Sequence, residues 1–148
     1  GVFNALQNEQ SLAMSVNNLC DGASRAVFKT LNFDMRVYDR LKMFVHAEDG
    51  DTLNSLPIPD GALSVFIRLG SDILENYYEY EIPLTMSREE RLSGNPNSDG
   101  YKNEVWRPEN NFDVDLKKLV KIKEERNDPS RNFPFNEEYT IPDTVSID

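Results

Sequence analysis

Three stretches of sequence decide the fold: YDRLKMFVHAE at residues 38–48, FIRLGSD at 66–72 and NYYEYEIPL at 76–84. In the third stretch, residues alternate between two faces: Tyr78, Tyr80, Ile82 and Leu84 share one, and Tyr77, Glu79 and Glu81 share the other. A period of two residues is that of a β-strand with one buried face. These stretches therefore predict an antiparallel sheet.

The same alternation predicts further strands toward the N-terminus. We expect five strands in all, at residues 11–17, 26–35, 41–47, 64–69 and 77–84. Leu12, Met14 and Val16 would be buried in the first strand, and Val27, Leu31, Phe33 and Met35 in the second. Residues 49–61 and 88–101 are rich in Gly, Pro, Asn and Asp and predict surface loops.

One helix is expected near the C-terminal third, at about residues 115–126. Asp113 or Asp115 can cap its first turn, and Asn127-Asp128-Pro129 ends it. Because no crossover helices separate the strands, a parallel sheet is disfavoured. We therefore predict a jelly-roll-like antiparallel β-sandwich over residues 1–127. Residues 128–148 form an extended tail, which we interpret as the truncated start of the next strand of a longer protein.

Composition limits the classes of function. The chain has 148 residues and a net charge of −10, which argues against non-specific binding to nucleic acid or to anionic lipid. No apolar run reaches the roughly 20 residues that a membrane-spanning helix needs, and no signal peptide is recognisable. Cys20 is the sole cysteine, so an internal disulfide is impossible. We expect a domain that is not itself inserted in a membrane.

Few residues offer catalytic chemistry. His46, the sole histidine, has Glu48 two residues away, but a solvated or hydrogen-bonded strand histidine is the favoured interpretation. Glu79 and Glu81 point to one side of a single strand and form no cleft by themselves. We therefore expect no catalytic residue and no enzyme activity.

Ligand binding has two candidates. The acidic run at residues 48–51, with Asp60, could bind calcium, but turn formation explains it and we predict no metal and no cofactor. Aromatic side chains could stack on a sugar ring or contact a partner protein. Tyr78 and Tyr80 are assigned to the core by the alternation. Tyr77 and Trp106 therefore remain as the candidate ligand- or partner-binding residues.

The order of five sequence blocks resembles a known family. The blocks are NEQSLAMSVNNLCDGASRAVFK at residues 8–29, RLKMFVHAE at 40–48, FIRLGSD at 66–72, NYYEYEIPL at 76–84 and EVWRPENNFDVDLKKLVKIK at 104–123. They look like a repeated soluble module of the SprA/Sov proteins of Bacteroidetes, and the resemblance spans roughly residues 8–126. These very large outer-membrane proteins are associated with gliding motility and form the translocon of type IX secretion.

The resemblance implies a non-enzymatic structural or interaction module of that translocon, within the cell envelope and associated with the outer membrane. Its partners would be other parts of the same protein and components of the secretion system. The alternative is a carbohydrate-binding β-sandwich of a cell-surface protein, with a glycan as ligand.

Overall fold

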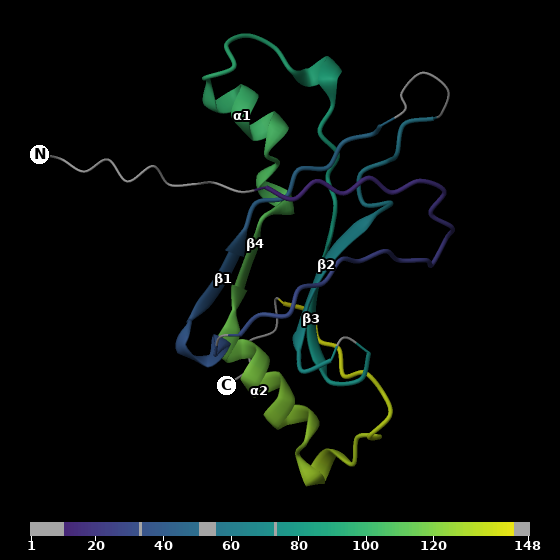
Figure 1. Cartoon of the computed structure of the whole chain (residues 1–148), viewed down its shortest axis with the longest axis vertical. Coiled ribbons are helices and arrows are strands. Elements are labelled where there is room, and N and C mark those ends of the chain that lie inside the picture. The colour runs from purple at the N-terminus through teal and green to yellow at the C-terminus, as the bar shows by residue number, and fades with distance from the viewer. Residues whose placement is uncertain (1–10, 33, 51–55, 73, 144–148) are drawn as a thin grey trace, which may run out of the picture. The chain divides into compact units, whose positions relative to one another are not determined.

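The computed structural model describes residues 11–32, 34–50, 56–72 and 74–143 (Figure 1). The chain divides into two compact units, Gly1–Phe33 and Asp34–Asp148. The described part of the first unit, residues 11–32, contains no helix and no strand. All regular elements of the described chain lie in the second unit. In chain order they are η1 (Met35–Val37), β1 (Arg40–Met43), β2 (Ser64–Gly70), β3 (Tyr77–Pro83), η2 (Glu89–Arg91), α1 (Asp99–Val105), η3 (Pro108–Asn110), β4 (Phe112–Asp115), α2 (Leu116–Arg126) and η4 (Pro129–Arg131).

β2 and β3 are antiparallel, as predicted, and together form a hairpin; their observed bounds differ from the predicted ones by one residue. The register pairs Ser64 with Pro83 at one end and Gly70 with Tyr77 at the other. Asp72 organises the connection, because its carboxylate accepts hydrogen bonds from the backbone N–H groups of residues 74, 75 and 76. A side chain at Gly70 would meet the carbonyl oxygen of Asn76 at 2.1 Å, so only glycine fits there.

β1 pairs with β4 in a second antiparallel sheet, with Leu41 opposite Val114. β4 runs directly into α2, and the Asp115 carboxylate caps α2 by accepting from the backbone N–H of Lys117 at 2.9 Å. The predicted helix is confirmed, including one of its two candidate caps. The strand before it was not predicted; its residues include Asp113 and Asp115, the two candidate caps of the helix.

The core lies where the two sheets and α2 meet. Phe112, Val114 and Leu119 are buried at its centre, with Phe112 only 1% exposed. The inner face of the β2–β3 hairpin packs against them, and the rings of Tyr80 and Phe112 are 5.6 Å apart. The remaining contributors are Leu41, Val45, Val65, Ile67, Leu69, Tyr78, Ile82, Leu116 and Ile122. The predicted inward faces of residues 64–69 and 77–84 are therefore largely confirmed. The strand predicted at 41–47 ends at Met43 in the structure; Leu41 and Val45 contact the core as predicted, whereas Met43 is exposed.

The expected five-stranded sandwich is replaced by a smaller mixed α/β arrangement. The described residues form two two-stranded sheets and two α-helices. The predicted strand at 11–17 is absent, as is the described part of the one at 26–35, in which Phe33 lies outside the described residues and Met35 begins η1. These segments have the alternation of a strand, but none of the described strands pairs with them to supply hydrogen bonds. No helix among the described residues is both long and apolar enough to cross a membrane.

The predicted loop at 88–101 contains ordered structure as well. Its end forms the first turn of α1, capped by the Ser98 hydroxyl, which accepts from the N–H of Tyr101 at 3.3 Å. The helix was missed because its sequence is polar and includes Gly100.

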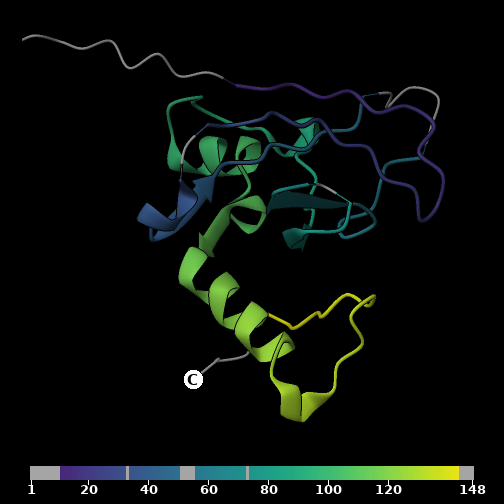
Figure 2. The same cartoon turned by 60° about the horizontal axis from the view of Figure 1, so that its bottom comes forward.

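Figures 1 and 2 show the segment after α2 turning back toward α2 and β3. The Asp143 carboxylate accepts hydrogen bonds from the Tyr80 hydroxyl at 3.0 Å and from the Lys118 ammonium at 2.8 Å. Residues 128–143 therefore contact the sheet and helix of the module, and the proposed division of the chain at residue 127 stays a prediction.

Candidate functional site

Tyr77, the first predicted binding residue, lies on the outer face of the β2–β3 hairpin. The Arg68 guanidinium lies over its ring, 4.1 Å from the ring centroid, and Arg68 also bonds Glu79 across the strands at 2.5 Å. The Tyr77 hydroxyl donates a hydrogen bond to the Glu138 carboxylate, and this contact raises the pKa of Tyr77. The Arg68 guanidinium thus covers one face of the Tyr77 ring, and the Tyr77 hydroxyl bonds Glu138 in the segment that follows α2.

Trp106, the second predicted binding residue, caps the C-terminal end of α1 and is 46% exposed. Its ring meets the imidazole of His46 edge-on, with centroids 5.8 Å apart. Tyr77 and Trp106 therefore belong to different clusters of side chains, and neither shares a described contact with the other. Trp106 keeps more of its ring free for a ligand.

His46 stands at the centre of the cluster that includes Trp106. Its Nδ1 is 2.5 Å from the carbonyl oxygen of Val105 and 3.2 Å from Ser87 Oγ, and its Nε2 is 3.3 Å from a Glu48 carboxylate oxygen. Ser87 Oγ itself donates to the same Val105 carbonyl at 2.9 Å. Serine, histidine and glutamate are the residue types of a hydrolase triad.

The hydrogen bonds of this cluster oppose nucleophile activation. A general base needs a nitrogen without hydrogen facing the serine hydroxyl. Here Nδ1 carries its hydrogen toward the Val105 carbonyl, which also takes the hydrogen of Ser87 Oγ. The cluster instead connects the end of α1 with His46, which follows β1, and with Ser87, which follows β3. The Ser87 N–H also donates to the Ala47 carbonyl at 2.7 Å.

A second polar cluster is buried beside the first. The Glu104 carboxylate pairs with Arg107 at 2.7 Å and accepts from the backbone N–H of Arg88 at 3.2 Å. Asn110 is fully buried, and its side chain bonds both the N–H and the carbonyl of Thr85 at 2.7 and 2.8 Å. Because its charges and polar groups are largely paired internally, this cluster stabilises the irregular segments between β3 and β4.

Two of the described candidates for calcium ligands, Asp49 and Asp60, accept hydrogen bonds from different parts of the backbone. Asp60 accepts a hydrogen bond from the N–H of Met86 at 2.9 Å, which lowers its pKa, and it lies 3.6 Å from the Arg88 guanidinium. Asp49 accepts from the N–H of Ile58, and Asp51 lies outside the described residues. In the described chain, no group of three or more His, Cys, Asp or Glu side chains is placed to hold a metal ion.

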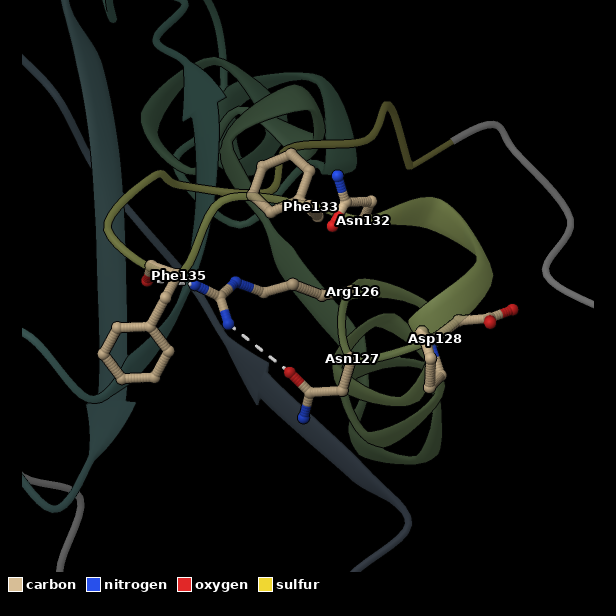
Figure 3. Close-up of a pocket in the computed structure, with 7 residues that line it drawn as sticks. Arg126, Asn127, Asp128, Asn132, Phe133 and Phe135 are labelled. Carbon is tan, nitrogen blue, oxygen red and sulfur yellow. Dashed lines mark hydrogen bonds between the residues drawn. The ribbon is translucent and has the colours of Figure 1, made fainter.

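A hollow of about 370 Å³ lies at the C-terminal end of α2 (Figure 3). Arg126 crosses it, 5.6 Å from the Phe133 ring and 5.9 Å from the Phe135 ring. Its guanidinium donates to the carbonyls of Phe135 and Glu137, at 2.7 and 3.2 Å, and to the Asn127 side chain. Arg126 thus holds the turn after α2, while Phe135 is 91% exposed. This hollow was not predicted, although the sequence places Phe133 and Phe135 shortly after Arg126, the last residue of α2.

A third exposed feature is the segment of residues 11–32, here named the N-terminal arm. The arm reverses at a turn in which Ala23 N–H donates to the Cys20 carbonyl at 3.0 Å (Figure 1). Seven large apolar side chains are exposed along it: Leu12, Met14, Val16, Leu19, Val27, Phe28 and Leu31. Exposure on this scale is unusual outside interaction surfaces.

Comparison with known proteins identifies the family. No curated protein matches the chain. The model of the SprA_N family, described as motility related/secretion protein, matches residues 2–146, nearly the whole chain. The match includes the whole predicted resemblance to the SprA/Sov proteins, residues 8–126, and extends beyond it at both ends, to residue 2 and through the segment after α2 to residue 146. Such a family associates the chain with the cell envelope. The chain belongs to the SprA_N family of motility-related and secretion proteins.

Proposed function

We propose that the chain is a non-enzymatic interaction module of a very large outer-membrane translocon that serves type IX secretion and gliding motility. The module contacts other parts of the same outer-membrane protein and components of the secretion system. The family match over residues 2–146 is the observation that carries this proposal.

The chemistry of the described residues supports a binding role over catalysis. His46, Ser87 and Glu48 are residue types found in catalytic triads. Here, however, His46 Nδ1 and Ser87 Oγ both donate to the Val105 carbonyl. Apolar surface, in contrast, is abundant on the N-terminal arm and at Phe135. Surfaces of this kind bind other proteins by removing apolar area from water.

A carbohydrate-binding role is the second candidate, and Trp106 is the observation that favours it. Its ring is half exposed, and aromatic rings stack on the apolar faces of sugars. Tyr77 supports this role less, because the Arg68 guanidinium lies over its ring.

The proposal is tested by deleting residues 2–146 in frame from the full-length protein, in cells that depend on type IX secretion. We expect the outer-membrane protein to be present at its normal level while export of its cargo and gliding both fall. Normal export by the deleted protein would contradict the proposal.

The carbohydrate alternative has its own test on the isolated chain. Binding on a glycan array that disappears in Trp106→Ala, together with normal export in the same variant, would favour a cell-surface lectin. Trp106→Phe is the matched control, because it retains an aromatic face. Absence of glycan binding in all three proteins is the result that we expect.

A further inference from the structure

Within the part of the chain that the structure describes, the backbone of the N-terminal arm has few hydrogen-bond partners. Across described residues 11–32, a single backbone–backbone hydrogen bond is present, the one that closes the turn at Cys20–Ala23. The N–H and C=O groups of residues 11–19 therefore have no partner within the arm. An extended segment in this state offers the same row of donors and acceptors as the edge strand of a sheet.

The side chains of residues 11–17 add a second strand property, since they alternate with a period of two. Leu12, Met14 and Val16 are apolar and exposed, with Leu12 76% exposed. The alternate positions are occupied by small or polar residues: Ser11, Ala13, Ser15 and Asn17. In an extended chain, alternate residues point to opposite sides. In an extended conformation, residues 11–17 thus have one side of large apolar residues and one side of small or polar residues.

The third property is charge. Residues 11–19 contain no charged side chain, and residues 1–33 carry two basic and two acidic residues. Residues 34–148 carry fourteen basic and twenty-four acidic residues, which accounts for the whole net charge of −10. Proteins protect exposed strands from pairing with other chains by placing charges or prolines on them. Residues 11–19 have neither, which is the composition of a segment that pairs with another chain or another part of the protein.

We infer that residues 11–17 form a β-strand by adding to an open sheet edge in a neighbouring part of the secretion protein. This inference rests on the proposed function and names the contact by which the module acts. The receiving surface has unpaired backbone N–H and C=O groups, and beside them an apolar groove that takes Leu12, Met14 and Val16. Main-chain hydrogen bonds supply affinity in this mode of recognition, and pockets for alternate side chains supply specificity.

An aspartate scan of residues 11–16 in the full-length protein tests the inference. Each variant adds the same charge to the same exposed segment, so Ser15→Asp is the matched control for Met14→Asp. Two quantities are measured in each variant: amide hydrogen exchange of residues 11–19 and export of cargo. We expect exchange roughly 100-fold slower in the full-length wild type than in the isolated chain.

The pattern of loss identifies the mode of contact. A strand predicts that substitution at 12, 14 or 16 removes the protection and lowers export, while substitution at 11, 13 or 15 has little effect. Losses with a period of three to four would indicate a helical contact and overturn the inference. Equally fast exchange in the isolated and full-length wild type would also overturn it. In either case, reduced export on deletion of residues 2–146 would leave the proposed function intact.

Discussion

The N-terminal arm and the unit that follows it use similar side chains with opposite results. Both contain alternating apolar residues, yet Phe112 in the second unit is 1% exposed and Phe28 in the arm is 77% exposed. The two regions differ in whether a neighbouring strand pairs with them. Each strand of the second unit lies beside another strand of that unit, whereas the arm has none among its described residues. Alternation thus determines which side of a strand is apolar, and the strand itself requires a partner.

The largest difference in the free energy of unfolding is expected between substitutions of two phenylalanines, one from each region. Phe112→Ala empties the centre of the core and should lower the free energy of unfolding by about 3–5 kcal/mol. Phe28→Ala removes an exposed ring and should change it by less than about 0.5 kcal/mol. Urea denaturation of the isolated chain measures both. Equal losses would show that the arm contributes to the same core.

The second prediction compares the loss of stability on substitution of two neighbouring asparagines. Asn110→Ala leaves the N–H and carbonyl of Thr85 without their partner, and the loss of stability should be about 1–3 kcal/mol. Asn111→Ala is the control, because the buried oxygen of the Asn111 side chain has no hydrogen-bond partner among the described residues. Thermal unfolding measures both variants, and a similar loss in the two would mean that packing around the side chains dominates over the hydrogen bonds.

Acid should destabilise the second unit. Three backbone N–H groups and the Asn76 amide bond the Asp72 carboxylate, and they hold its pKa well below its usual range. A carboxyl group whose pKa is lower in the folded state contributes stability above the unfolded value of about 3.9, and loses it as the pH falls toward the folded pKa. Asp39, Asp60, Asp113, Asp128 and Asp143 also have lowered pKa values and act in the same direction.

The urea midpoint between pH 6 and pH 2 measures this dependence. Asp72→Asn should flatten the curve, because the amide oxygen accepts hydrogen bonds at every pH. Asp72→Ala, which removes the acceptor, should lower stability already at pH 6. A wild-type curve as flat as that of Asp72→Asn would contradict the account of the β2–β3 connection.

The smallest expected effect concerns the segment after α2. Tyr80→Phe removes the hydrogen bond to Asp143 and should cost about 0.5–1.5 kcal/mol. Amide exchange of residues 137–143 should become faster while that of β2 and β3 stays unchanged. Tyr78→Phe is the control, since the ring of Tyr78 packs in the core and its hydroxyl has no hydrogen-bond partner in the described chain. Faster exchange in both variants would mean that Asp143 is not the anchor.

Local signals explain what the sequence could predict. The β2–β3 hairpin has clean alternation in both strands, and α2 has the Asp115 cap and a stop at Pro129, so both were predicted to within one or two residues. β4 and the His46 cluster depend on residues far apart in the chain. Ser87 and His46 are 41 residues apart, and Tyr77 and Glu138 are 61 apart. Nothing in the local sequence of either partner indicates such contacts.

Amide hydrogen exchange on the isolated 148-residue chain tests the central claim most directly, because it compares the two regions in one molecule. We predict that β2, β3, β4 and α2 are protected, while residues 11–32 exchange at nearly the rate of an unstructured peptide. Protection of residues 11–17 equal to that of β3 in the isolated chain would contradict the account, since the arm would then have its partner within the chain itself.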